Sequence, residues 1–148
     1  MDVNSCIKRA VEKVAGLENP WINLKLTPNL PVRTTHEMLT EAFKVLIKNA
    51  NEAIRDLTEE QKSISVESYL KEDFIEVVIR DSGSGIRPEN LERVFDMRFT
   101  TKASGLGFGL FWTKDYIEGL GGTINVSSIV GHGTVFTINL PIAQAQEE

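Results

Sequence analysis

The fold is decided by the stretch KVLIKNANEAI, residues 44–54. Its hydrophobic residues recur every three or four positions, which predicts the middle of an amphipathic helix. With the flanking residues the pattern extends from about Thr35 to Leu57, so this helix is expected to be the longest element of the chain. Asn49 lies on one of its hydrophobic lines, between Leu46 and Ala53.

A carboxamide on such a line needs a partner, because an unmade hydrogen bond costs about 1–3 kcal/mol. Asn49 can be a side chain bonded to a neighbouring backbone group. It can equally be an oxygen ligand for a metal ion that a substrate carries in. The helix pattern alone leaves both interpretations open.

Length and composition predict one globular domain. The chain has 148 residues, of which 41% are hydrophobic and 25% charged, which is ordinary for a soluble protein. The net charge of −5 argues against a nucleic-acid partner and against contact with an anionic membrane, since both favour a basic surface. Cys6 is the only cysteine, so an intramolecular disulfide and a cysteine-based zinc site are excluded.

The hydrophobic runs are all shorter than the ~20 residues of a membrane helix, and the first residues, MDVN, do not resemble a secretion signal. We therefore expect a cytoplasmic protein, or the cytoplasmic portion of a longer one. A single domain is expected over residues 1–148, with residues 1–3 and 142–148 as loose ends.

Hydrophobic spacing predicts the other elements. Helices are expected at 3–14 and 110–120, with a short one opened by Pro88, and strands at 21–27, 64–68, 74–80, 123–127 and 134–140. The strand at 74–80 is expected to be central and buried on much of both faces. Strands and helices do not alternate regularly, which favours an α/β two-layer sandwich with a mixed, mostly antiparallel sheet covered on one face by helices.

The stretch DSGSGI, residues 81–86, ends the buried strand abruptly. It can be a plain turn, because these residue types are common in turns. It can also place the Asp81 carboxylate to accept a hydrogen bond from the amino group of adenine. Guanine offers a carbonyl at that position, so such a site would prefer ATP over GTP. Gly83 and Gly85 would let the backbone approach the base.

The stretch GLGFGL, residues 105–110, runs into a predicted helix. Free N–H groups and the helix dipole at such a place attract phosphate, but a flexible loop gives the same pattern. No strand leads into it, so it is not a Rossmann fingerprint, and no Gly-Lys-Ser/Thr follows, so it is not a P-loop.

Two further segments carry candidate side chains. In FDMRFTTK, residues 95–102, the hydroxyl groups of Thr100 and Thr101 and the ammonium group of Lys102 could meet phosphate oxygens. Phe95 and Phe99 favour core positions, and Lys102 could equally be a solvated charge. In GHGTVF, residues 131–136, a hairpin turn is the plain interpretation, but Thr134 could place its hydroxyl beside the adenine edge, directly or through water.

In this order the motifs resemble the ATP-binding fold shared by gyrase B, Hsp90, MutL and the sensor histidine kinases, the GHKL or Bergerat fold. Residues 49–53 resemble the N box, 81–85 the G1 box, 95–102 the F box and 105–110 the G2 box. The run FTTK and the segment GGTINVSS, residues 121–128, fit the catalytic domain of bacterial two-component histidine kinases. The resemblance covers roughly Asn4 to Pro141.

The resemblance implies a role for each matching position. Asn49 would coordinate Mg²⁺ and Asp81 would read adenine, with Ala53, Ile86 and Leu110 lining the base pocket. Thr101, Lys102 and Gly105 to Gly109 would form the ATP lid over the phosphates. The residues expected to bind ATP are Asn49, Glu52, Ala53, Asp81, Gly83, Gly85, Ile86, Thr100, Thr101, Lys102, Gly105, Leu106, Gly107, Phe108, Gly109, Leu110 and Thr134.

The chain departs from the family pattern at Val45. Many histidine kinases carry a polar residue one helical turn before the Mg²⁺ ligand, and the gyrase and Hsp90 branch carries a glutamate there as general base. Valine cannot polarise water, so the clamp-ATPase interpretation loses its base. Glu41, one turn further back, is expected to be a solvated charge. His36 and His132 are not expected to accept phosphate, so the phosphoacceptor histidine should lie on a separate dimerisation domain.

The resemblance therefore implies Mg-ATP binding and transfer of the γ-phosphoryl group to that histidine, in a pathway that leads to a response regulator receiver domain. Two alternatives stay open at this point. One is a regulatory module that binds nucleotide and transfers little, and the other is a serine kinase of the anti-sigma type on the same fold.

Overall fold

The computed structural model describes residues 2–97 and 109–143. The helices are α1 (Val3–Val14), α2 (His36–Ala53), α3 (Pro88–Leu91) and α4 (Gly109–Gly119). The strands are β1 (Ile22–Leu26), β2 (Ile64–Leu70), β3 (Phe74–Asp81), β4 (Thr123–Ile129) and β5 (Gly133–Pro141). Each of these elements lies where the hydrophobic spacing predicts one, with ends that differ by a few residues.

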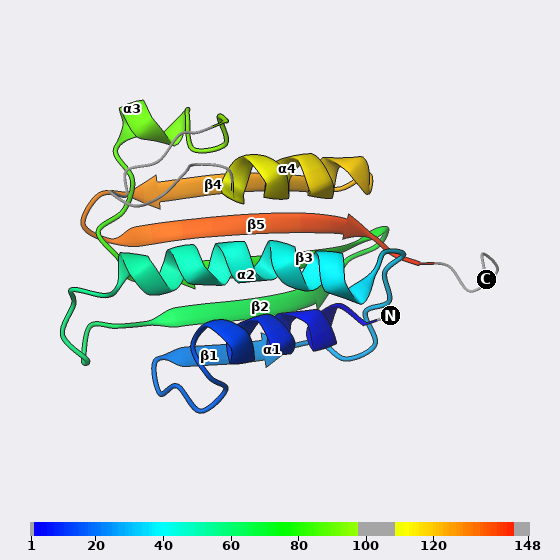
Figure 1. Cartoon of the computed structure of the whole chain (residues 1–148), viewed down its shortest axis with the longest axis horizontal. Helices are drawn as coiled ribbons and strands as arrows, with labels where there is room; N and C mark the ends of the chain where they lie inside the picture. Colours follow the sequence, from blue (N-terminus) through cyan, green and yellow to red (C-terminus); the bar gives the residue numbers. More distant parts are fainter. Residues whose placement is uncertain (1, 98–108, 144–148) are drawn as a thin grey trace.

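The strands form one sheet in the order β1-β2-β3-β5-β4 (Figure 1). The pair β1 and β2 is parallel, while β2 with β3, β3 with β5 and β4 with β5 are antiparallel. Figure 1 shows α1, α2 and α4 on one face of this sheet. The predicted two-layer sandwich with a mixed, mostly antiparallel sheet is therefore confirmed.

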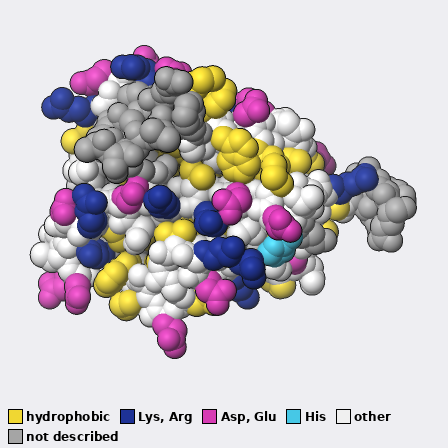
Figure 2. Space-filling model, in the orientation of Figure 1, with side chains coloured by type: hydrophobic (Ala, Val, Ile, Leu, Met, Phe, Trp, Pro, Cys, Tyr) yellow, Lys and Arg dark blue, Asp and Glu magenta, His cyan; other side chains and the backbone are white. Residues whose placement is uncertain are grey.

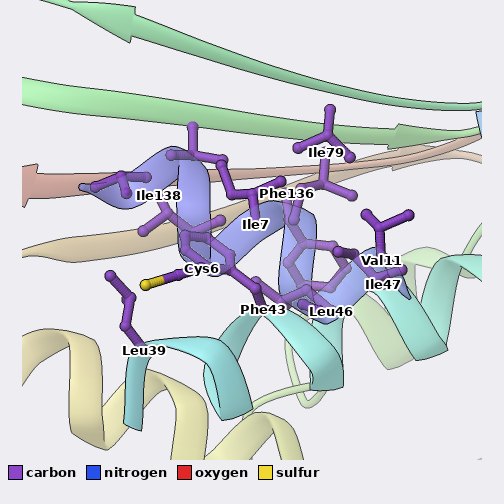
Figure 3. Close-up of a cluster of buried hydrophobic side chains, with 14 of the residues drawn as sticks. Cys6, Ile7, Val11, Leu39, Phe43, Leu46, Ile47, Ile79, Phe136 and Ile138 are labelled. Carbon is purple, nitrogen blue, oxygen red and sulfur yellow. The ribbon is translucent and has the colours of Figure 1, made fainter. Parts of the chain in front are cut away.

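Helix α2 supplies the centre of the core. Its Thr35 N-cap accepts the Met38 N–H at 3.2 Å, which satisfies one of the free N–H groups of the first turn. The helix then buries a hydrophobic stripe against α1 and the sheet, including Phe43 at 0% exposure. Figure 3 shows Cys6, Ile7 and Val11 of α1, Leu39, Phe43, Leu46 and Ile47 of α2, Ile79 of β3, and Phe136 and Ile138 of β5 in this cluster.

The central strand β3 is buried mainly on its helix-covered face. Ile75, Val77 and Ile79 point into the core at no more than 1% exposure, and Val78 is the only buried residue on the opposite face. Arg80 on that face is exposed. The expectation of burial on both faces is therefore correct at Val78 and wrong at Arg80, because no second layer covers that face in the described part of the chain.

On the helix-covered side, charged groups of both signs are intermixed and hydrophobic side chains gather over α4 (Figure 2). Phe111 of that helix is 36% exposed. Among the described residues, no helix combines the length and hydrophobicity that crossing a membrane requires.

The described chain ends are attached, contrary to the expectation of loose ends. Asp2 caps α1 by accepting the Asn4 N–H at 2.7 Å, and Val3 is fully buried. At the other end the Ala143 N–H donates to the Pro31 carbonyl at 3.0 Å. Residues 1 and 144–148 lie outside the described residues. A cap and a backbone bond, neither visible in hydrophobic spacing, hold these ends in place.

Candidate functional site

Helix α2 presents one strip of side chains to the candidate site. Val45, Asn49 and Ala53 are spaced by four residues, so they lie on the same side of the helix over about 12 Å. Asn49 is half-buried, whereas Leu46 is 1% exposed. The predicted hydrophobic line through Leu46, Asn49 and Ala53 is therefore wrong, because Asn49 lies on the strip beside the core and not within it.

Each end of this strip contacts a different glycine motif. A methyl group added at Gly83 would lie 2.7 Å from Cβ of Ala53, and one added at Gly109 would lie 3.1 Å from Cγ1 of Val45. Asn49 is thus flanked by the Asp81 turn on one side and by the start of α4 on the other. The C-terminal half of α2, the end of β3 and the start of α4 thus lie together towards one end of the molecule (Figure 1).

Asp81 stands at the end of β3, where it pairs with Ile64 of β2 and Thr134 of β5. Its Oδ1 accepts the Gly83 N–H at 2.8 Å, and the Thr134 N–H also donates to the carboxyl group. Burial raises the pKa of the Asp81 carboxyl above its ordinary value, and these two donors act in the opposite direction. A partly buried acceptor with spare lone pairs therefore lies beside Ala53.

The turn after Asp81 is held against the β4–β5 hairpin. Gly85 has φ +83°, and a Cβ there would lie 2.5 Å from the Ile129 carbonyl oxygen, so only glycine fits without strain. The Gly131 N–H donates to the Ser84 carbonyl at 2.7 Å. The half-buried Ile86 follows. The turn predicted to approach a base is therefore a fixed structure supported by the neighbouring hairpin.

Ser128 of β4 is a site residue to which sequence reasoning assigned no role. Its hydroxyl contacts the backbone of Ile86 and Gly133 and the hydroxyl of Thr134, at 2.7, 2.8 and 3.0 Å. A serine inside a predicted strand carries no signal of this kind, because the contacts depend on strand register. Its direct pairing with Thr134 becomes visible only in the folded sheet.

The start of α4 lies beside Val45. The Gly109 carbonyl accepts the Thr113 hydroxyl at 2.8 Å, and Thr113 is fully buried. Leu110 is half-buried and packs against the core. Lys114 lies over the Phe95 ring at 4.9 Å, and Phe95 meets Phe136 edge to face, so the predicted core position of Phe95 is confirmed.

Part of the predicted site lies outside the described residues. This holds for Thr100, Thr101, Lys102, Gly105, Leu106, Gly107 and Phe108, and Phe99, predicted to be a core residue, also lies outside the described residues. Of the remaining predicted residues, Glu52 is half-buried on the last turn of α2 and Ala53 is exposed at its end. The described residues thus include those predicted to bind the base and the metal ion.

Glu41, His36 and His132 are the remaining candidate groups, and His132 lies in the hairpin turn that supports the Asp81 turn. Glu41 is 53% exposed at its side chain and pairs with Lys44 at 3.1 Å, so the prediction of a solvated charge is confirmed. His36 begins α2, about 25 Å along the helix from Ala53, and His132 is exposed in the β4–β5 turn. A shallow hollow around Phe74 and Pro141 lies at the opposite end of β3 from Asp81.

The donor set suits a metal ion that arrives with its substrate. Within residues 2–97 and 109–143, no group of three or more His, Cys, Asp or Glu side chains could hold an ion without other ligands. The half-buried Asn49 offers an amide oxygen between the two glycine motifs. Mg²⁺ takes few protein ligands and completes its octahedron with water and phosphate oxygens, so these residues fit such an ion.

Comparison with known proteins agrees with this geometry. Residues 34–144 match the model of the histidine kinase-, DNA gyrase B- and HSP90-like ATPase family. Sensor histidine kinase ZraS of Salmonella typhimurium is 41% identical over 153 aligned positions, covering 100% of this chain and 32% of that protein. A probable C4-dicarboxylate sensor kinase of Bacillus subtilis is 37% identical over 98 positions, covering 66% of this chain and 18% of that protein. The chain therefore spans a third or less of the length of these relatives.

Solved structures agree as well. The mycobacterial sensor histidine kinase MprB superposes with a TM-score of 0.78 at 26% identity, covering 96% of this chain and 95% of that one. The catalytic domain of histidine kinase ThkA superposes with a TM-score of 0.76 at 27% identity, covering 96% and 93%. The chain belongs to the histidine kinase-, DNA gyrase B- and HSP90-like ATPase family, as an ATP-binding catalytic domain of the sensor histidine kinase type.

Proposed function

We propose that residues 1–148 form one domain that binds Mg-ATP and transfers its γ-phosphoryl group to a histidine on a separate helical dimerisation domain. A response regulator receiver domain would then take the phosphoryl group from that histidine. The observation that carries the proposal is the strip on α2. It places Asn49 between the Asp81 turn and the start of α4, about 6 Å from Val45 and from Ala53 along the helix axis.

Asp81 is the adenine-reading group in this proposal. Its carboxylate, already fixed by the Gly83 N–H, has lone pairs left for the 6-amino group of adenine. A 6-oxo purine would bring a second acceptor to the same place, so ATP is favoured over GTP. Ala53, Gly83, Ile86 and Leu110 form the surroundings of the base, and Thr134 borders Asp81 from β5.

The phosphates extend along α2 towards Gly109. Asn49 would hold Mg²⁺ through its amide oxygen, and Mg²⁺ when bound neutralises charge on the phosphate oxygens. Thr100, Thr101, Lys102 and Gly105 to Gly109 remain the proposed phosphate contacts. The domain thus orients the γ-phosphoryl group in line with an incoming imidazole nitrogen. A nitrogen–phosphorus bond forms while the bond to the bridging oxygen breaks, and ADP leaves.

Val45 favours transfer to a protein nucleophile over hydrolysis. It offers no oxygen or nitrogen with which to activate water, and Glu41 is exposed and paired with Lys44. A neutral imidazole is already a nucleophile near pH 7, so it needs no base from this domain. We further propose that the domain works in the cytoplasm, where ATP is available, without contact to nucleic acid or membrane.

Calorimetric titration of the full chain with ATP, GTP and ADP, with and without Mg²⁺, tests the binding site. We expect ATP binding that strengthens with Mg²⁺ and little GTP binding. Asn49→Ala should lose most of the Mg²⁺ effect, whereas Asn51→Ala, two residues along α2 on another side of the helix, should keep it. A Mg²⁺ effect that survives in Asn49→Ala contradicts its assignment.

Incubation with labelled ATP and the helical dimerisation domain of the same signalling protein tests transfer. The label should appear on that domain in an acid-labile, alkali-stable form, as expected for phosphohistidine. Tight ATP binding without label would support the regulatory-module alternative. An acid-stable product would point to a serine kinase.

A further inference from the structure

A hydroxyl network lies directly beside Asp81, across three neighbouring strands. Asp81 of β3 pairs with Thr134 of β5, and Thr134 pairs with Ser128 of β4. Residues paired across a sheet point to the same face, so the three side chains form one row on the helix-covered face. Thr134 is 5% exposed, while Asp81 and Ser128 are half-buried.

The contacts of Ser128 determine which group donates in each hydrogen bond. A serine hydroxyl has one proton and two lone pairs. The Gly133 carbonyl, 2.8 Å away, has no proton, so the Ser128 proton goes to it. The Ile86 N–H, 2.7 Å away, takes one lone pair of Ser128. The contact with Thr134 Oγ1 at 3.0 Å can then be filled only by the Thr134 proton, donated to the second lone pair.

This arrangement leaves the Thr134 hydroxyl with lone pairs alone for a ligand. The neighbouring Asp81 carboxylate is also an acceptor. We propose that Ser128 is a positioning residue that fixes Thr134 as an acceptor, so that the site selects purines with an amino group at position 6. The inference rests on the proposed function and adds to it the residue that orients the Thr134 hydroxyl.

The group at position 6 of the purine determines whether two acceptors strengthen or weaken binding. The 6-amino group of adenine donates, so it suits two acceptors. The 6-oxo group of hypoxanthine or guanine only accepts, so it leaves buried acceptors unpaired. A water molecule held between Asp81 and Thr134 would give both protons to them and present lone pairs outward. It would therefore favour an amino group in the same way.

The test compares the affinities of the full chain for ATP and for inosine triphosphate, which carries a 6-oxo group and no 2-amino group. In Ser128→Ala the Thr134 proton loses its acceptor and can turn to the 6-oxo group. The preference for ATP should fall by roughly three- to tenfold. Ser128→Thr keeps a hydroxyl and should keep the preference. Ser127→Ala, on the exposed opposite face, is the matched control and should leave it unchanged.

The ratio of affinities separates this role from simple support of the turn. Ser128→Ala also removes the acceptor of the Ile86 N–H, but a loosened turn should weaken both nucleotides alike. Thr134→Val removes the second acceptor and should lower the ATP preference by itself. In that background Ser128→Ala should change the preference no further, because Ser128 acts through Thr134.

An unchanged ratio in Ser128→Ala overturns the inference and leaves ATP binding intact. A ratio that changes equally with and without the Thr134 hydroxyl also overturns it. Absence of any ATP binding by the parent chain overturns the proposed function and this inference together.

Discussion

Asp81, the proposed adenine-binding group, shows at the level of one residue how burial of a carboxyl group costs stability. Its carboxyl group is partly buried, and burial raises its pKa. The folded protein therefore holds a proton on Asp81 at pH values where the unfolded chain has lost it. At higher pH the folded protein carries a desolvated charge that is useful only when a donor such as an amino group is bound.

Replacement of Asp81 by asparagine should reveal this cost as a pH dependence. The folded parent binds more protons than the unfolded chain between the ordinary pKa of 3.8 and the raised value, so its free energy of unfolding falls as pH rises through that window. Asp81→Asn lacks this fall, so its stability relative to the parent should increase with pH. Urea unfolding at several pH values from about 4 to about 7 measures the difference. Parallel curves for the two proteins would contradict it.

The same residues show how far sequence reasoning reaches at this scale. Asp81 could be placed because it ends a hydrophobic run, which is a local signal. Asn49 could be placed on the long helix but not on the correct side of it, since a shift of one position turns a helical residue by about 100°. Ser128 could not be given a role, because its hydrogen bonds depend on the register of β4 against β5.

At the scale of secondary-structure elements, helices α2 and α4 contact each other through Val45 and Gly109. The two methyl groups of Val45 would lie 3.1 and 3.8 Å from a Cβ at position 109. The β-branched side chain has little rotamer freedom on a helix, so it sets how closely α4 can begin beside Asn49. Val45 thus has a packing role at the position where the family pattern has a polar residue.

Alanine at position 109 should expose this role. Gly109→Ala places a methyl group against Val45, whereas Gly119→Ala, in the same helix, has no neighbour within 4 Å. We expect Gly109→Ala to be less stable than Gly119→Ala by about 1 kcal/mol, and Val45→Ala to remove most of that difference. Thermal unfolding of the variants measures it. Equal stability of the two alanine variants would show that the contact is loose.

At the same scale, the sequence predicts whether each element is a helix or a strand, but it predicts less well which strands pair with one another. Hydrophobic spacing placed the nine described helices and strands to within a few residues, because spacing is a local property. The parallel pairing of β1 with β2 follows from the crossover through α2, and spacing within a strand carries no information on its direction. The sequence offers Asn4 or Ser5 as the cap of the first helix, but the N-cap is Asp2, because several polar residues at this end of the chain are suitable caps.

At the scale of the whole molecule, the hydrogen bonds that attach α1 to the β1–β2 edge of the sheet lie away from the candidate site. The Asn4 side chain of α1 donates to the Thr27 carbonyl at 2.5 Å and accepts the Ser68 hydroxyl at 2.9 Å. Ser68 is 1% exposed and lies four residues along β2 from Ile64, the partner of Asp81, or about 13 Å. This network joins α1 to β1 and β2 without touching the site.

Removal of the Asn4 carboxamide should therefore affect stability alone. Asn4→Ala leaves a buried hydroxyl and a carbonyl without their partner, which should cost about 1–3 kcal/mol of unfolding free energy. The ATP affinity of the folded protein should stay within a factor of about two of the parent value. Urea unfolding and calorimetry measure the two quantities, and Asn23→Ala, at an exposed position of β1, is the control. A parallel loss of ATP affinity would show that α1 is coupled to the site.

The strip on α2 has one mechanical consequence. Because Ala53, Asn49 and Val45 belong to a single hydrogen-bonded helix, the spacing between the proposed purine-binding and metal-binding positions cannot change without breaking helical turns. In the proposed function, any opening or closing of the site around a nucleotide must therefore come from the elements that lie on either side of α2. In the proposed function, α2 therefore sets a fixed distance that the bound triphosphate has to span.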